Sequence, residues 1–120
     1  MKSFRDLKVW QKSHALTLKK VYKVSTLLPR EEQYGITSQI RRAAVSIPAN
    51  IAEGCGRNTD NELARFLEIA MGSASELEYL VMLLQDLNYL TSQSINGIDA
   101  EITEVKRMLA SFIVKLRADR

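Results

Sequence analysis

The chain of 120 residues contains one histidine and one cysteine, which are the first residues to consider for catalysis or metal binding. A carboxylate-bridged metal pair in a helical bundle needs a Glu-x-x-His motif on each of two helices. Here Gln11 stands three residues before His14, and there is no second histidine. One histidine with one cysteine also falls short of a usual zinc ligand set. We therefore predict no metal site and no cofactor.

Neither residue stands in a catalytic motif. His14 falls on the apolar face of the first expected helix, where we predict a core histidine with one hydrogen-bonded nitrogen. Cys55 lies between Gly54 and Gly56 after the second helix, far from the only histidine, so a Cys–His nucleophile has weak support. The glycines do not form the phosphate-binding pattern GxxxxGKS/T. We therefore expect a free thiol, no catalytic residue and no enzymatic activity.

The cations of the first expected helix form a stripe that could follow a phosphate backbone. At 100° per residue they fall within about 60° of one another, with no acid between them. Lysines on a helix are adequate for phosphate contacts that do not depend on sequence. An ordinary solvated face, or pairing with the acidic third helix, would explain the stripe equally well. The stripe consists of Arg5, Lys8, Lys12, Lys19 and Lys23.

A row of polar side chains follows one edge of the isoleucine stripe in the second expected helix. Half-buried polar groups need hydrogen-bond partners, which favours contacts with another helix or another subunit over contacts with solvent. The neighbouring Arg41 points to a different side, closer to water, and joins the candidate nucleic-acid-binding residues. The row, for which we expect structural or interface roles, consists of Gln39, Arg42, Ser46, Asn50 and Glu53.

Charge is strongly segregated along the chain although the net charge is only +3. Residues 1–57 hold 11 Lys/Arg and 4 Asp/Glu, residues 58–104 hold 1 and 9, and residues 105–120 hold 5 and 1. The three segments therefore carry +7, −8 and +4. Such asymmetry favours a polyanionic partner, head-to-tail self-association, or simple pairing between neighbouring helices.

Apolar residues recur at helical spacing almost throughout, and no segment alternates as a strand would. We expect a first helix over about 6–27, ended by Pro29. A second should run over about 34–54, where Pro48 removes the bond to the Ala44 carbonyl and either kinks the helix or divides it; we favour the kink. Thr59 and Glu62 have the spacing of a capping box at the start of the third helix. A fourth begins after a turn near 89–93.

These segments predict an all-α fold, an antiparallel up-down four-helix bundle with a Pro-kinked second helix, in one domain over residues 1–120. The segment Gly72 to Ser75 has little side-chain bulk and suits tight packing or an oligomer contact. The longest apolar runs are far shorter than the ~20 residues of a membrane-spanning helix, so we expect no membrane association. The charged N-terminal residues lack the apolar stretch of a secretory signal, which predicts a cytoplasmic protein.

Several motifs resemble the four-helix-bundle family first noticed as 23S rRNA intervening-sequence proteins. They are Phe4…Leu7…Trp10, Pro29…Glu32-x-Tyr34-Gly35, the continuous stretch Gln39 to Gly54, and Ala70-x-Gly72-Ser73-Ala74-x-Glu76-Leu77-Glu78. The resemblance covers essentially the full chain, and Ser46-Ile47-Pro48-Ala49-Asn50-Ile51-Ala52-Glu53-Gly54 is its most specific part. It implies an up-down four-helix bundle that assembles into a ring-shaped pentamer, without implying a known activity. The accessory determinant of diversity-generating retroelements is a similar protein, a basic pentamer that binds nucleic acid and a reverse transcriptase.

Two functions follow from these observations. The first is a homo-oligomeric, pentameric module that binds RNA or DNA through basic surface stripes, with a protein such as a reverse transcriptase as a possible further partner. The alternative is an oligomeric protein–protein interaction scaffold with no direct role in nucleic-acid binding, in which the segregated charge drives subunit assembly.

Overall fold

The computed structural model describes residues 3–118, which are mostly helical and contain no strand. Three consecutive helical segments form what we call helix one, and three long helices follow. Two short 3-10 turns, η1 and η3, precede helix one and α3. The bounds are η1 (Phe4–Asp6), α1 (Lys8–Ala15), η2 (Leu16–Val21), α2 (Tyr22–Ser25), η3 (Arg30–Glu32), α3 (Ile36–Cys55), α4 (Asp60–Asp86) and α5 (Ser92–Ala118).

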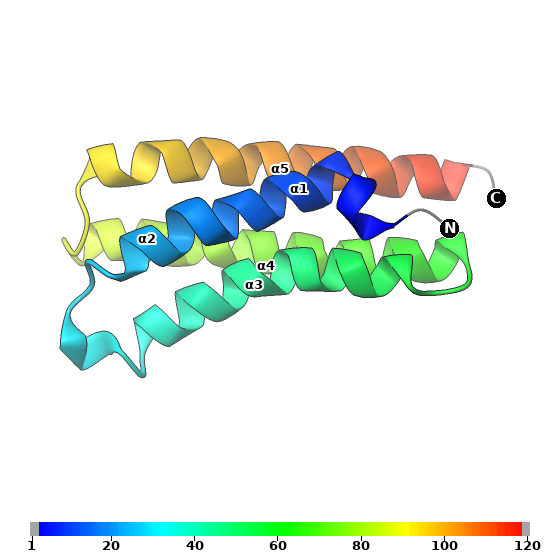
Figure 1. Ribbon diagram of the computed structural model, residues 1–120. Coiled ribbons are helices and arrows are strands. Elements are labelled where there is room, and N and C mark those ends of the chain that lie inside the picture. Colours follow the sequence, from blue (N-terminus) through cyan, green and yellow to red (C-terminus); the bar gives the residue numbers. More distant parts are fainter. Residues whose placement is uncertain (1–2, 119–120) are drawn as a thin grey trace.

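The helices lie side by side in a bundle that measures 47 × 22 × 20 Å (Figure 1). In that view helix one and α4 run from right to left, whereas α3 and α5 run from left to right. Helix one packs against α3 and α5, and α4 packs against the same two helices. Helix one and α4 are therefore diagonal to each other. The predicted all-α helical bundle is confirmed.

The start of α4 shows how local sequence fixes a helix end. Thr59 is the N-cap in extended conformation, and its hydroxyl accepts the backbone N–H of Glu62 at 3.1 Å. The same hydroxyl lies 3.3 Å from the Glu62 carboxylate, to which it donates. This pair satisfies one of the free N–H groups of the first turn, as the sequence spacing predicts. Further along, Leu67, Leu77 and Leu84 are fully buried at helical spacing.

The core is made of isoleucine, leucine, valine and alanine from all four helices. Ile47 and Ile51 of α3 are fully buried, as are Ile102 and Leu109 of α5. Each fully buried aliphatic side chain of this kind stabilises the fold by about 1.5–3 kcal/mol relative to exposure. None of the helices in the described range is both long enough and apolar enough to cross a membrane.

Helix one buries only part of the apolar face that residue spacing predicts for it, which consists of Leu7, Trp10, His14, Leu18, Val21 and Leu28. Val21 is fully buried, and Leu7, Trp10 and Leu28 pack half-buried against the core, but His14 is exposed and Leu18 is 60% exposed. η2 is a π-helix, whose wider turn shifts the angular position of Leu18 and of the residues after it. Ser13 and Thr17 also tolerate burial because their hydroxyls donate to backbone carbonyls. The residues buried in helix one are Val9, Ser13, Leu16, Thr17, Val21 and Ser25.

Pro48 lies within α3, which runs without interruption from Ile36 to Cys55. The alternative of two shorter helices is therefore not observed, while the kink stays a prediction. The missing N–H of Pro48 leaves the Ala44 carbonyl without its helical donor. The hydroxyl of Thr17 lies 3.0 Å from that carbonyl oxygen and donates to it across the helix interface. A buried acceptor that the proline would leave unpaired is thus satisfied by helix one.

Candidate functional site

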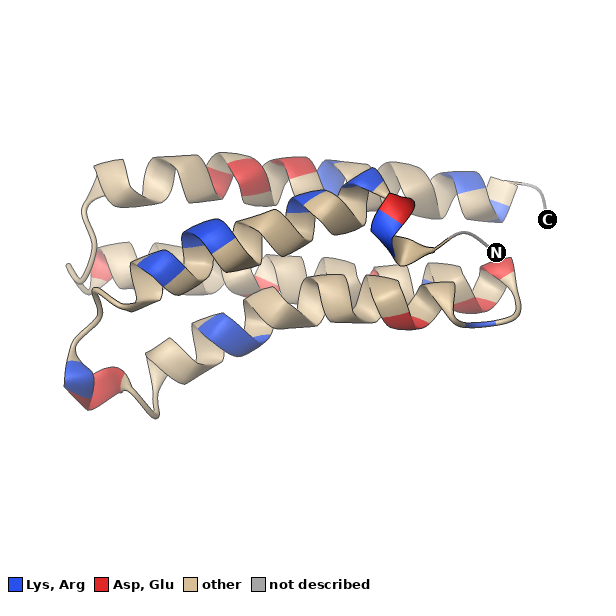
Figure 2. Ribbon diagram, in the orientation of Figure 1, with Lys and Arg blue, Asp and Glu red and all other residues tan. Residues whose placement is uncertain are grey.

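The predicted basic stripe lies along helix one, where Figure 2 shows several cationic segments. Arg5, Lys8, Lys19 and Lys23 are exposed. None of these four forms an ion pair within 4 Å with any residue that the structure describes. The Arg5 guanidinium instead lies 4.6 Å from the centre of the Phe4 ring. Three cations on helix one, and Arg5 on the preceding turn η1, are therefore available to an external anion.

Lys12 differs from the rest of the stripe because its ammonium lies 3.8 Å from the Glu104 carboxylate of α5. Lys20, which is outside the predicted stripe, pairs in the same way with Glu101 at 3.4 Å. The expected pairing of the stripe with the acidic third helix is wrong, because that helix is α4 and it lies diagonally across the bundle. Pairing between neighbouring helices does occur, but its acids come from α5.

Arg41 is more enclosed than predicted. Its Nε donates to the Ser25 hydroxyl at 2.7 Å, and its guanidinium lies 4.9 Å from the centre of the Tyr22 ring. The side chain is half-buried between α2 and α3, whereas the next residue, Arg42, is exposed. The expectation that Arg41 is closer to water than Arg42 is therefore wrong, and Arg41 serves first to join two helices.

The predicted polar row on α3 divides into two parts. Ser46 and Asn50 are half-buried and find partners within the chain. The Ser46 and Ser73 hydroxyls are 2.8 Å apart and link α3 to α4, and the Asn50 amide donates to the Ser46 carbonyl at 2.8 Å. Glu53 is exposed and pairs with Arg57 one turn later at 2.9 Å. These three residues therefore have structural roles.

Gln39 and Arg42 form the second part of the row and are exposed rather than half-buried. Neither side chain has a hydrogen bond or ion pair to another described residue. Two hollows meet at Arg42. One, of about 410 Å³, is lined by Gln39, Arg42, Ala43, Ser46 and Glu76. The other, of about 430 Å³, is lined by Tyr22, Arg41, Arg42, Val45 and Ser46.

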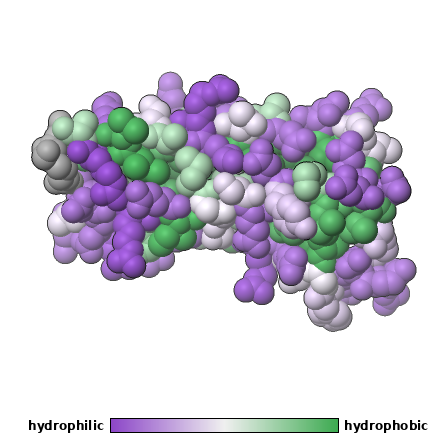
Figure 3. Space-filling model, turned by 180° about the vertical axis from the view of Figure 1, so that it is seen from behind, coloured by the Kyte–Doolittle hydropathy of each residue, from purple (hydrophilic) through white to green (hydrophobic). Residues whose placement is uncertain are grey.

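The outer side of α4 carries apolar side chains among acids, and Figure 3 shows the molecule from behind, with green apolar areas between hydrophilic side chains. Tyr79 and Met82 are both about half exposed. At Gly72 an added Cβ would meet nothing within 4 Å, so no other helix of this chain approaches it. Elsewhere in the same segment, Ala74 is fully buried and the Ser73 hydroxyl meets Ser46 of α3, so the predicted close packing occurs on the side that faces the core. An oligomer contact at Gly72 stays a prediction.

The two residues considered first for catalysis lie apart from any cluster of reactive groups. The His14 ring stacks on Trp10, with centres 4.7 Å apart and planes at 10°. Its predicted burial is wrong, because the neighbouring Ser13, whose hydroxyl donates to the Trp10 carbonyl, is the residue that faces the core. Cys55 is a half-buried free thiol, and burial raises its pKa above the ordinary value. No group of three or more metal-ligating His, Cys, Asp or Glu occurs within residues 3–118.

Sequence reasoning did not find a groove at the end of the bundle where helix one begins. Its cations Arg107 and Lys115 belong to the C-terminal segment with charge +4, which was the one available signal. Its apolar residues on α5 recur at helical spacing, as core residues do. A sequence pattern shows that a helix face is apolar, but not whether another helix covers it.

Comparison with known proteins agrees with this fold. A family model described as 23S rRNA-intervening sequence protein matches residues 5–111. A crystal structure of a protein of unknown function from the S23 ribosomal protein family of Bacteroides thetaiotaomicron is similar, at 30% identity and a TM-score of 0.79. The similarity covers 88% of this chain and 97% of that one. Among curated proteins, none matches the chain. Because the family model spans most of the sequence, the chain belongs to the 23S rRNA-intervening sequence protein family.

Proposed function

We propose that the protein is a non-enzymatic, homo-oligomeric binding module that associates with RNA or DNA through the basic stripe of helix one. The observation that supports this most directly is the set of exposed cations with no ion pair among the described residues. These side chains need not break an intramolecular ion pair before they contact a phosphate. They are Arg5, Lys8, Lys19 and Lys23.

Lys12 and Arg41 have lesser roles in this proposal. The Lys12–Glu104 pair is long and both side chains are more than a third exposed, so it contributes at most about 1 kcal/mol and can yield to a phosphate. Arg41 would have to leave Ser25 and Tyr22 to bind an external anion. We therefore place Arg41 at the edge of the site, where it orients α3 beside the stripe.

Self-association would strengthen such contacts by repeating the stripe around one assembly. The segregated charge fits a head-to-tail contact, since the cations of helix one and the acids of α4 lie on diagonal sides of the bundle. Contacts between two different faces generate rings when the rotation closes. We propose a pentameric ring, as the family resemblance implies, with the exposed apolar side chains of α4 at the contact: Ile69, Tyr79 and Met82.

In this proposal the subunit is an antiparallel up-down bundle with α3 kinked at Pro48, and the protein acts in the cytoplasm. A reverse transcriptase, which the resemblance suggests as a protein partner, would bind to the assembled ring. The steps of the proposal are separable, because nucleic-acid binding, assembly and partner binding are measured independently.

The alternative function is a protein–protein scaffold, which one observation favours. Arg42 and Gln39 are exposed beside two hollows and have no side-chain partner within the described residues. An exposed arginine next to a hollow is typical of the energetic centre of a protein interface. On this reading, Arg42→Glu would lower the mass measured by light scattering, because the reversed charge would be unpaired in the contact. An unchanged mass would count against the scaffold.

The main test is fluorescence anisotropy of labelled structured RNA, single-stranded DNA and duplex DNA at several salt concentrations, with light scattering on the same samples. Lys19→Glu should weaken binding of all three probes and reduce the salt dependence. Arg65→Glu is the matched control, since it makes the same change in charge at an exposed residue on α4. Equal binding by Lys19→Glu and the parent at every salt concentration would exclude the stripe as the site.

A further inference from the structure

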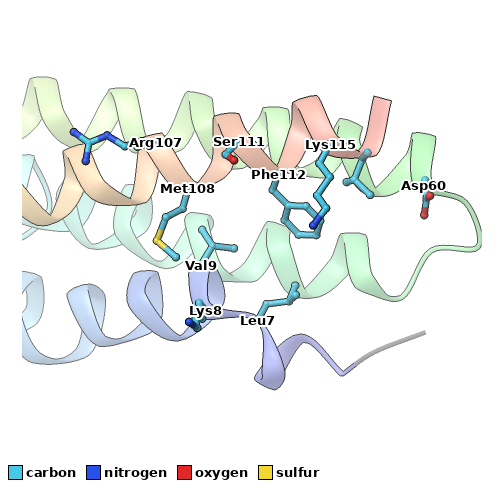
Figure 4. Close-up of a pocket in the computed structure, with 10 residues that line it drawn as sticks. Leu7, Lys8, Val9, Asp60, Arg107, Met108, Ser111, Phe112 and Lys115 are labelled. Atoms are coloured by element: carbon cyan, nitrogen blue, oxygen red, sulfur yellow. The ribbon is translucent and has the colours of Figure 1, made fainter. Parts of the chain in front are cut away.

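A groove lies between the start of α1, the start of α4 and the last turns of α5 (Figure 4). Its volume is about 830 Å³, within the usual range of ligand-binding clefts. Apolar side chains make up its floor, and three cations with one acid stand at its rim. The floor consists of Leu7, Val9, Met108, Phe112 and Leu116, and the rim of Lys8, Arg107, Lys115, Asp60 and Ser111.

The groove exists because helix one is shorter than its neighbours at this end of the bundle. α1 begins at Lys8 and the chain before it turns aside as η1, while α5 continues to Ala118 (Figure 1). Within the described residues, helix one therefore reaches the groove only with its first residues, and the last turns of α5 extend beyond it. Met108, Phe112 and Leu116 pack against the core on one side and remain half-buried. No helix of residues 3–118 fills the fourth position of the bundle over this length.

We propose that the groove is the docking site for an amphipathic helix of a partner protein, with leucine-like residues on one face and acidic residues along its flanks. A helix in this position would continue the line of helix one and complete the four-helix packing that the rest of the bundle has. This is the helix-in-groove mode of recognition, in which apolar side chains spaced by three and four residues anchor the partner. The site is independent of the proposed nucleic-acid function.

The charge at the rim selects an acidic partner. Lys8 and Lys115 are exposed on opposite walls, and neither forms an ion pair with a described residue. Arg107 is exposed and pairs only at 3.6 Å with Glu104 of its own helix. Three cations face one carboxylate, Asp60, so the rim is net positive. Acidic flanks on the partner helix would complement this rim, whereas a helix with basic flanks would be repelled by it.

The shape of the groove favours a helix over a small anionic amphiphile. From Arg107 to Leu116 the wall on α5 is roughly 14 Å long at 1.5 Å per residue, which corresponds to between two and three turns of a partner helix. The groove is open along its length rather than enclosed. A fatty-acid-sized ligand would keep much of its surface in water there, whereas binding sites for such ligands bury most of it.

The proposal is tested by fluorescence anisotropy with a labelled helical peptide of about 12 residues that carries leucines at i, i+3, i+4 and i+7 and glutamates on its flanks. Two control peptides keep the leucine pattern but replace the glutamates by lysine or by glutamine. We expect the acidic peptide to bind best. Ser111→Trp should weaken its binding at least about tenfold, because the indole would occupy the groove without removing a core contact.

Ala110→Trp is the matched control, since Ala110 is exposed on the same helix but does not line the groove. It should leave peptide affinity unchanged. Lys115→Glu should lower the affinity for the acidic peptide and raise the affinity for the lysine peptide.

The proposal is overturned if Ser111→Trp and Ala110→Trp bind the acidic peptide equally, if the three peptides bind equally, or if dodecanoate binds the groove and no peptide does. A loss of oligomer mass in Ser111→Trp alone would also overturn it, since the occupant would be a second copy. RNA binding by Ser111→Trp should equal that of the parent, which separates this proposal from the previous one.

Discussion

The hydroxyl of Thr17 lies 3.0 Å from the carbonyl oxygen of Ala44 and 2.9 Å from that of Ser13, so it shares its one proton between them, and Ala44 is the residue whose helical partner is removed by Pro48. Thr17 lies in the π-helical segment of helix one, so this segment faces the turn of α3 that lacks the Pro48 N–H. This hydrogen bond crosses the interface between helix one and α3 in a fully buried region. It gives the first prediction.

Thr17→Val should lower the free energy of unfolding by about 1–3 kcal/mol, because a buried carbonyl loses its donor while the shape of the side chain is kept. Urea denaturation measures this change. Thr103→Val is the control, since Thr103 is exposed on α5, and it should stay within about 0.5 kcal/mol of the parent. In a Pro48→Ala background, where residue 48 regains its N–H, the cost of Thr17→Val should shrink. Equal costs in both backgrounds would show that the two residues are not coupled.

Lys19 and Lys12 should contribute unequally to nucleic-acid binding. Lys19 is exposed without an ion pair in the described chain, whereas Lys12 lies 3.8 Å from Glu104. Lys19→Gln removes one positive charge from each subunit. For every subunit whose Lys19 contacts a phosphate of duplex DNA, the slope of log affinity against log salt concentration should become less steep by about 0.9. Lys12→Gln should reduce it less. A larger effect of Lys12→Gln would mean that the Lys12–Glu104 ion pair opens readily and that the nucleic acid lies closer to α5.

Gly54 and Gly72 should respond in opposite directions to the same change. A Cβ at Gly54 would lie 2.8 Å from Phe66 Cβ and 2.9 Å from Leu63 Cδ1, so Gly54→Ala should destabilise the fold by about 1–3 kcal/mol. Gly72 lies inside α4 with open space around it, and Gly72→Ala should stabilise the helix by about 0.5–1 kcal/mol. Thermal unfolding of the two variants is the measurement. If Gly72→Ala destabilises the protein and lowers its oligomer mass, another subunit packs at this glycine.

Cys55 should react slowly with thiol reagents near neutral pH. Burial raises its pKa above the ordinary 9.0, so less thiolate is present at a given pH. The rate of its reaction with a disulfide reagent should increase at a higher pH than the rate for a free cysteine peptide. In urea, where Cys55 is exposed, the two rates should be equal. A folded-state rate equal to that of the peptide at pH 8 would contradict this.

The raised pKa of Cys55 also makes the stability of the fold depend on pH. Because the folded state holds the Cys55 proton more tightly, the thiol's contribution to stability is present below pH 9.0 and is lost as the pH rises through the higher folded-state pKa. Cys55→Ser should remove this part of the pH dependence. The measurement is the urea midpoint of both proteins across the alkaline range.

Local pattern was sufficient for much of the fold. The helices expected over about 34–54 and after Thr59 correspond to α3 and α4, because apolar residues at helical spacing and a side-chain cap act within a few residues of each other. The family motifs were also readable in the sequence, and the family match over residues 5–111 confirms them.

The amino-acid sequence by itself determined that the chain folds as a helical bundle, which residues are apolar, and where its charges lie along the chain. Only the tertiary structure decided which face of helix one is buried, since that depends on the distant Ala44 carbonyl and on a π-helical turn. It also decided that Lys12 pairs with Glu104 and that, within residues 3–118, no helix covers the groove at the end of α5. Each of these depends on the order of helices around the bundle, which brings together residues far apart in sequence, and the periodicity of a single helix carries no information about its neighbours.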